Sequence, residues 1–252
     1  VELGIFAILV LTIVNLRGVR DAGRAFSIPT QAFIVIFGGM IAYGCIAVAL
    51  GWFPGSSTAP LPPIPEGPAG ILGLALILKA FSSGCAATTG IEAISNGVQT
   101  FEPPESKNAA TTMMRMACIL SVFFIGVTFL AYHGAIIPSE NESETMVSQV
   151  ARALFGSGIL YFIVQAVTVA ILFLAANTPF ADFPRVASRL AEDGYLPHQF
   201  ANLGSRGVYT FGIMFLSASS FFLVVFFGGS VHALIPLYAV GVFQGFSISQ
   251  LG

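Results

Sequence analysis

Long stretches of this chain carry no charge, and this feature constrains its fold more than any other. From residue 207 to residue 252 there is no Asp, Glu, Lys or Arg. Over the whole sequence 9% of residues are charged, whereas an ordinary soluble domain carries about 25%. So few charges cannot cover a surface that faces water, nor can they form the basic stripe of a nucleic-acid-binding protein. The sequence therefore predicts an all-α, polytopic membrane protein that sits in the lipid bilayer and binds no nucleic acid.

Seven apolar stretches are predicted to cross the membrane, because a spanning helix needs about 20 mostly apolar residues. Five of them are residues 3–16, 28–53, 70–97, 116–137 and 153–178. The uncharged stretch 207–252 is too long for one helix, and Gly228-Gly229-Ser230 divides it into two. The first stretch is short and starts at Val1 without an initiator Met, so we expect further helices upstream.

The positions of the basic residues predict the orientation of the spans. Eight of the ten Lys and Arg residues fall in alternate connections, which are expected to be cytoplasmic; these eight are Arg17, Arg20, Arg24, Lys107, Arg115, Arg185, Arg189 and Arg206. The opposite connections, 54–68 and 138–146, contain none. The N-terminus of the chain is therefore expected outside and its C-terminus inside. Lys79 and Arg152 lie nearer the outer ends of their spans, where snorkelling accounts for them.

Residues 182–194 are predicted to form a short amphipathic helix at the cytoplasmic interface. Phe183, Val186, Ala187 and Leu190 fall on one helical face, and Gly194 with the following Pro197 ends the run.

The third span contains the candidate site. Small and hydroxylated residues run from Ser82 to Thr89 and include Ser83 and Thr88, and Glu92 follows. A carboxylate inside the membrane is costly and usually marks an ion path. Thr89 and Glu92 are three residues apart and would face the same way on a helix. A break in the helix near 82–90 would free carbonyls and hydroxyls to line a cavity. In the alternative reading the helix is continuous and its small residues allow close packing.

Tyr238 is a further candidate, in the last span. It follows Pro236, whose missing N–H frees a backbone carbonyl, and a tyrosine at this depth needs a partner for its hydroxyl. We therefore expect it to line a pore. The sequence has no His-Glu-x-x-His or Gly-x-Ser-x-Gly motif of an enzyme and no glycine-rich phosphate loop, so neither an enzyme nor a cofactor is expected.

Several segments resemble the amino acid–polyamine–organocation (APC) transporters. They are Asn15-Leu16-Arg17-Gly18-Val19-Arg20, Thr89-Gly90-Ile91-Glu92-Ala93-Ile94-Ser95-Asn96-Gly97-Val98 and Ala191-Glu192-Asp193-Gly194-Tyr195-Leu196-Pro197. The resemblance aligns the seven spans with helices four to ten of a LeuT-like inverted-repeat fold. It implies that residues 1–53 hold the last two helices of the first repeat. Residues 69–252 would then form the complete second repeat, with its first helix broken near 82–90.

Within this superfamily the sequence is most similar to the KimA-type potassium importers of bacteria. The string around Glu92 and the run Asn177-Thr178-Pro179-Phe180-Ala181-Asp182-Phe183-Pro184-Arg185 carry this similarity. The resemblance implies that Thr89, Glu92 and Tyr238 bind potassium. It also implies missing upstream helices, a C-terminal regulatory domain, a homodimer and a location in the bacterial plasma membrane.

The predicted function is proton-coupled import of potassium, a small cation, with no resident cofactor. Hydroxyl groups and one carboxylate suit a cation. Ser82, Ser83, Thr88, Thr89 and Glu92 supply them. The alternative is an amino acid permease of the same superfamily, in which a half-helix N-terminus would bind the substrate carboxylate and Glu92 would bind its ammonium.

Overall fold

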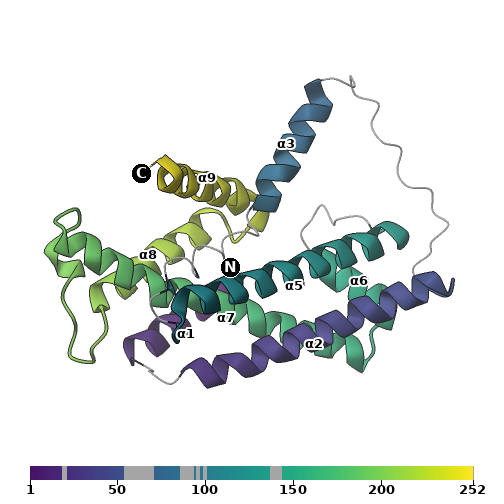
Figure 1. Ribbon diagram of the computed structural model, residues 1–252, viewed down its shortest axis with the longest axis horizontal. Helices are drawn as coiled ribbons and strands as arrows, with labels where there is room; N and C mark the ends of the chain where they lie inside the picture. The colour runs from purple at the N-terminus through teal and green to yellow at the C-terminus, as the bar shows by residue number, and fades with distance from the viewer. Residues whose placement is uncertain are drawn as a thin grey trace. The chain divides into compact units, whose positions relative to one another are not determined.

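The computed structural model describes residues 1–18, 22–53, 71–85, 94, 97–98, 101–136 and 144–251. Within these residues all regular structure is helical, which confirms the predicted all-α class. In chain order the helices are α1 (Glu2–Leu16), α2 (Ala22–Ala49), α3 (Ile71–Cys85), α5 (Glu105–His133), α6 (Met146–Phe155), α7 (Ile159–Glu192), η3 (His198–Phe200), α8 (Thr210–Phe226) and α9 (Val231–Leu251) (Figure 1). They form two compact units, and each unit is described by itself.

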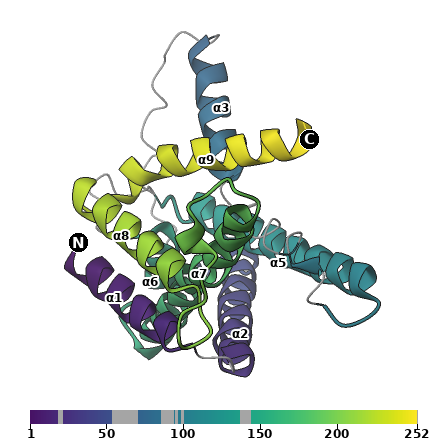
Figure 2. The same ribbon diagram turned by 90° about the vertical axis from the view of Figure 1, so that its left-hand side faces the viewer.

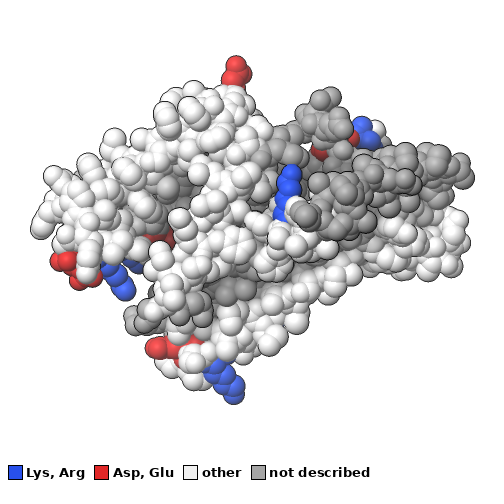
Figure 3. Space-filling view, turned by 90° about the horizontal axis from the view of Figure 1, so that it is seen from above, with Lys and Arg blue, Asp and Glu red and all other residues white. Residues whose placement is uncertain are grey.

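Seven of the described helices are apolar and lie where the sequence predicts membrane spans. Three contain stretches long and apolar enough to cross a membrane, Ser27–Ala49, Glu105–His133 and Ile159–Glu192. Helices α1, α3, α8 and α9 carry shorter apolar stretches. Phe6, Phe124 and Phe222 are exposed at 65%, 65% and 63%, and few charged side chains appear on the face in Figure 3. Because a protein in water rarely exposes so much apolar surface, this chain is a membrane protein.

The first unit comprises Val1–Met40 and Phe155–Ser230. In it α1, α7 and α8 pack against one another, and Figure 2 shows α1 and α8 side by side. Leu11, Phe180 and Ile213, one from each helix, are buried together at the centre of this packing. The apolar stripe of each helix thus meets the other two.

Two side-chain hydrogen bonds also join α1 to its neighbours in the first unit. Thr12 Oγ1 and Ser217 Oγ of α8 lie 2.7 Å apart. Asn15 Nδ2 donates to Asn177 Oδ1 of α7 at 2.7 Å. Membrane helices use such bonds because lipid tails offer a polar side chain no partner. The two bonds fix the position of α1 on α7 and α8.

The predicted bounds of the fifth span and the predicted separate helix at 182–194 are wrong. Residues 153–155 belong to α6, and a turn with Gly156 at φ +62° separates α6 from α7. Helix α7 then continues through Pro179 and Pro184 to Glu192. The amphipathic segment is therefore the last part of a long helix.

Packing explains why α7 continues past its prolines. Ala187 and Ala191 are buried against Phe200 of η3, and Pro184 is buried close to Gly212 of α8. These contacts stabilise the helical conformation where proline alone disfavours it. Of the residues predicted to share an apolar face in this segment, Val186 and Leu190 are exposed at 47% and 41%, whereas Ala187 is buried. The small residues face the protein instead.

The second unit comprises Ile41–Leu154 and Val231–Gly252. Glycines let α2 and α5 approach closely in this unit. A Cβ added at Gly44 would lie 2.7 Å from Cδ1 of Leu130, which is completely buried, and one added at Gly126 would collide with Ile41. Small residues at helix contacts are typical of membrane proteins.

The predicted division of the last apolar stretch is confirmed. Helix α8 ends at Phe226 and α9 begins at Val231. Between them Gly228 and Gly229 have φ values of +61° and +73°. Only glycine adopts this backbone conformation readily, so these two glycines allow the chain to turn.

Candidate functional site

Two of the five residues predicted to form the site lie in the described part of the chain. Ser83 lies near the end of α3, and Tyr238 lies in α9. Thr88, Thr89 and Glu92 lie outside the described residues. The geometry of the site can therefore be followed from Ser83 and Tyr238.

Helices α3 and α9 contact each other within the second unit, as both ribbon views show (Figures 1 and 2). A pocket of about 600 Å³ lies between them. The described residues that line it are Lys79, Ser82 and Ser83 of α3 and Ile235, Pro236 and Ala239 of α9. The α3 residues are spaced i, i+3, i+4 and so occupy one face of that helix. The structure thus brings Ser83 against the segment of α9 that contains Pro236.

Tyr238 is not among the described residues that line this pocket. Its side chain is 42% exposed, whereas the neighbouring Ala239 is 6% exposed and does line the pocket. Successive residues of a helix point about 100° apart. Tyr238 therefore lies on a neighbouring face of α9, outside the described lining of the pocket that contains Ser83.

Lys79 is a pocket residue that the sequence-based reasoning missed, whereas Ser82 belongs to the hydroxylated run that was expected to line a cavity. Lys79 was expected to snorkel, and its exposed side chain lines the pocket beside the two serines. Its spacing from Ser82 and Ser83 on α3 was the available signal. Among the described lining residues none is acidic, and no described carboxylate forms a salt bridge with Lys79. The described wall on the α3 side therefore offers one ammonium group and two hydroxyls.

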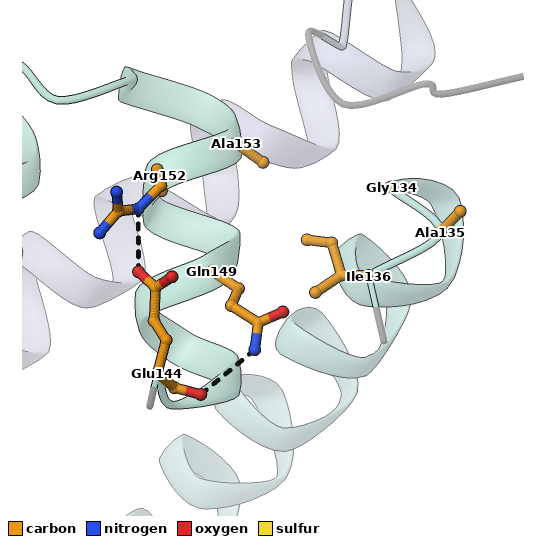
Figure 4. Close-up of a pocket in the computed structure, with 7 residues that line it drawn as sticks. All are labelled: Gly134, Ala135, Ile136, Glu144, Gln149, Arg152 and Ala153. Carbon is orange, nitrogen blue, oxygen red and sulfur yellow. Dashed lines mark hydrogen bonds and ion pairs between the residues drawn. The ribbon is translucent and has the colours of Figure 1, made fainter. Parts of the chain in front are cut away.

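A second pocket, of about 380 Å³, lies between the end of α5 and the start of α6. Figure 4 shows Glu144, Gln149 and Arg152 from the α6 side of it. Arg152 Nε donates to Glu144 Oε1 at 2.9 Å, and Ser148 Oγ donates to the same oxygen at 2.7 Å. Gln149 Nε2 donates to the backbone oxygen of Glu144 at 3.2 Å.

These bonds give Arg152 a partner that the snorkelling explanation omits. The Arg152 side chain is 52% exposed and that of Glu144 25% exposed. Glu144 precedes α6 and accepts bonds from three of its residues, so it stabilises the first turns of this helix. Among the described residues no group of three His, Cys, Asp or Glu could hold a metal ion.

Comparison with known proteins places this architecture in a family. Residues 2–250 match the family model for amino acid permeases. The chain is also 43% identical to the potassium transporter KimA of Bacillus subtilis (strain 168). That alignment covers 100% of this chain and 41% of the relative, so the chain spans about two fifths of the relative's length. Both matches confirm the resemblance found around Glu92 and Asp193, and they confirm a transporter family rather than an enzyme. The chain belongs to the amino acid permease family.

Proposed function

We propose that this chain is part of a proton-coupled potassium importer. The observation that carries the proposal is the 43% identity to a potassium transporter over the full length of the chain. The identity extends over the third predicted span, which contains Glu92, and over the last span, which contains Tyr238. Membership in a permease family supports transport in general, and the potassium transporter among its relatives supports the choice of ion.

The proposed potassium ligands are Thr89, Glu92 and Tyr238, with Ser83 and Thr88 along the path of the ion. Potassium can exchange its weakly held water shell for hydroxyl and carbonyl oxygens. Pro236, in the same helix as Tyr238, lacks the N–H that would otherwise donate to a backbone carbonyl one turn earlier. Glu92 would balance the charge of the ion. When Glu92 is protonated this balance is lost, and ion release becomes linked to proton binding.

The proposed architecture is the LeuT-like inverted repeat. Residues 1–53 would supply the last two helices of the first repeat and residues 69–252 the second repeat, whose first helix is broken near 82–90. Rocking of one repeat against the other would then alternate access to the site. We place the N-terminus of the chain outside and its C-terminus in the cytoplasm of a bacterium, because the basic connections are expected to face inward.

We further propose that the whole protein is a homodimer in the plasma membrane with a cytoplasmic C-terminal regulatory domain. Potassium and protons would be its only small-molecule requirements, with no resident cofactor. Both proposals rest on the KimA-type resemblance.

An amino acid permease is the second candidate function. The family description supports it, and so does the α3 wall of the pocket, where Lys79 with Ser82 and Ser83 could bind a carboxylate. The candidates differ in the charge of the group that enters the pocket. A potassium importer needs oxygen ligands, whereas an amino acid permease needs donors for a carboxylate and an acceptor for an ammonium group.

Uptake by the full-length protein in liposomes distinguishes the two functions. Rubidium serves as the potassium surrogate, and labelled amino acids are measured in parallel. We expect saturable rubidium uptake that an inward proton gradient accelerates and that excess amino acids leave unchanged. Uptake of a labelled amino acid without rubidium flux would overturn the potassium proposal and support the permease.

A further inference from the structure

The pocket between α3 and α9 contains a basic side chain, Lys79, that the proposed potassium site does not use. We infer that it binds a small monovalent anion, held by the ammonium group of Lys79 and the hydroxyls of Ser82 and Ser83. This inference concerns an ion of opposite charge to potassium, and it does not rest on the proposed import of potassium.

The first step in the argument is the donor set. Lys79, Ser82 and Ser83 lie on one face of α3 and all line the same pocket. An ammonium group offers three N–H donors and no acceptor, and each hydroxyl offers one further donor. Hydrogen bonds from an ammonium group to an anion are among the strong ones. The three side chains together can therefore surround one side of a small anion.

The second step is the missing counter-charge. Lys79 belongs to the apolar helix α3 and its side chain is exposed, so its charge is balanced by water or by an ion of opposite sign. No carboxylate of the described residues forms a salt bridge with it, and the described pocket lining contains no acidic residue. An anion in the pocket would supply the opposite charge.

The third step is the opposite wall. Ile235, Pro236 and Ala239 contribute only apolar side chains from α9. A wall of this kind lowers the local dielectric, which strengthens the attraction between the ammonium group and an anion. The same wall offers no side-chain oxygen, so an ion in the pocket is held from the α3 side. The volume of about 600 Å³ leaves room for the anion together with water.

The test is thermal unfolding of the purified full-length protein, with chloride replacing bulky gluconate at constant ionic strength. A ligand that binds only the folded protein stabilises it by RT ln(1 + [L]/Kd), so above Kd the unfolding temperature keeps rising with the logarithm of the ligand concentration. We expect a rise with chloride that follows this relation. In Lys79→Gln the apparent affinity should fall at least about tenfold, because a hydrogen bond to a charged group is lost together with the charge. Lys79→Arg should retain part of the effect.

Lys107→Gln is the matched control. Lys107 is an exposed lysine of α5 outside both pockets, so its replacement should leave the chloride response unchanged. If Lys79→Gln does not fold, the double variant Ser82→Ala/Ser83→Ala, which keeps the charge, should still weaken the response. Acetate in place of chloride separates a general anion site, which stabilises with both, from a halide site. A wild-type protein whose unfolding temperature does not rise with chloride, or an unchanged response in Lys79→Gln and in the serine variant, would overturn the inference.

Discussion

Gly212 of α8 packs tightly against Pro184 of α7, and replacing it by alanine should destabilise the protein. A Cβ built at Gly212 would lie 2.9 Å from both Cα and Cβ of Pro184. Ordinary contacts of a Cβ begin near 3.4 Å. Because Pro184 Cα is a backbone atom, no side-chain rotation can relieve this contact. One of the two helices must move.

Two opposing contributions determine the size of the effect. Overpacking of a tight contact costs about 1–3 kcal/mol. Alanine in place of glycine within a helix contributes about 1 kcal/mol in the stabilising direction. The cost is expected to exceed the gain, which leaves Gly212→Ala about 1 kcal/mol less stable than wild type. Gly212→Val should be worse, because valine is larger and gains less in helix propensity.

The assay is the thermal unfolding of the full-length protein in detergent, with Gly39→Ala in α2 as the matched control. No atom lies within 4 Å of a Cβ added at Gly39, so this variant should be as stable as wild type or more stable. Gly212→Ala should unfold at a lower temperature than Gly39→Ala. Equal stability of the two variants would refute the close packing of α7 on α8, and with it the explanation of why α7 continues past Pro184.

Two further predictions concern polar contacts. A double-mutant cycle of Asn15→Ala and Asn177→Ala should give a coupling free energy of about 0.6 kcal/mol, with about 1.7 kcal/mol as the upper end for membrane helices; strictly additive single effects would contradict the bond between α1 and α7. Glu144→Gln should cost less than about 1 kcal/mol, because Arg152 and Glu144 are 52% and 25% exposed. The difference from wild type should shrink at high salt, and a difference that does not depend on salt would mean that the ion pair is not its cause.

The sequence predicts the fold class and the positions of the spans because both depend on local composition. Uncharged stretches mark the apolar helices, and the pair Gly228-Gly229 marks the turn between α8 and α9. The same local reasoning fails around Pro184. Proline predicts the end of a helix. Helix α7 nevertheless continues beyond Pro184, because buried contacts with η3 and α8 stabilise its helical conformation there. Packing between distant segments determines the conformation of the chain around Pro184, and such packing cannot be predicted from the periodicity of apolar residues.

The candidate site also has a part that local sequence predicts and a part that it does not. Ser83 could be proposed from its hydroxyl-rich neighbourhood, which is a local property. The pocket that Lys79 and Pro236 share could not be predicted from the sequence, because the two residues come together only when α9 packs on α3. The bond between Asn15 and Asn177 likewise joins residues 162 positions apart. Contacts of this kind follow from the tertiary structure alone.

Proton-driven rubidium uptake by Glu92→Gln tests the central claim most directly. The variant is compared with wild type and with Glu102→Gln, which removes an exposed carboxylate outside both pockets. All three are full-length proteins reconstituted at equal amounts and checked for folding. Glu102→Gln should match wild type, and Glu92→Gln should lose uptake driven by the proton gradient, because a neutral amide neither balances potassium nor takes up a proton. Normal gradient-driven uptake by Glu92→Gln would contradict a coupling role for this carboxylate.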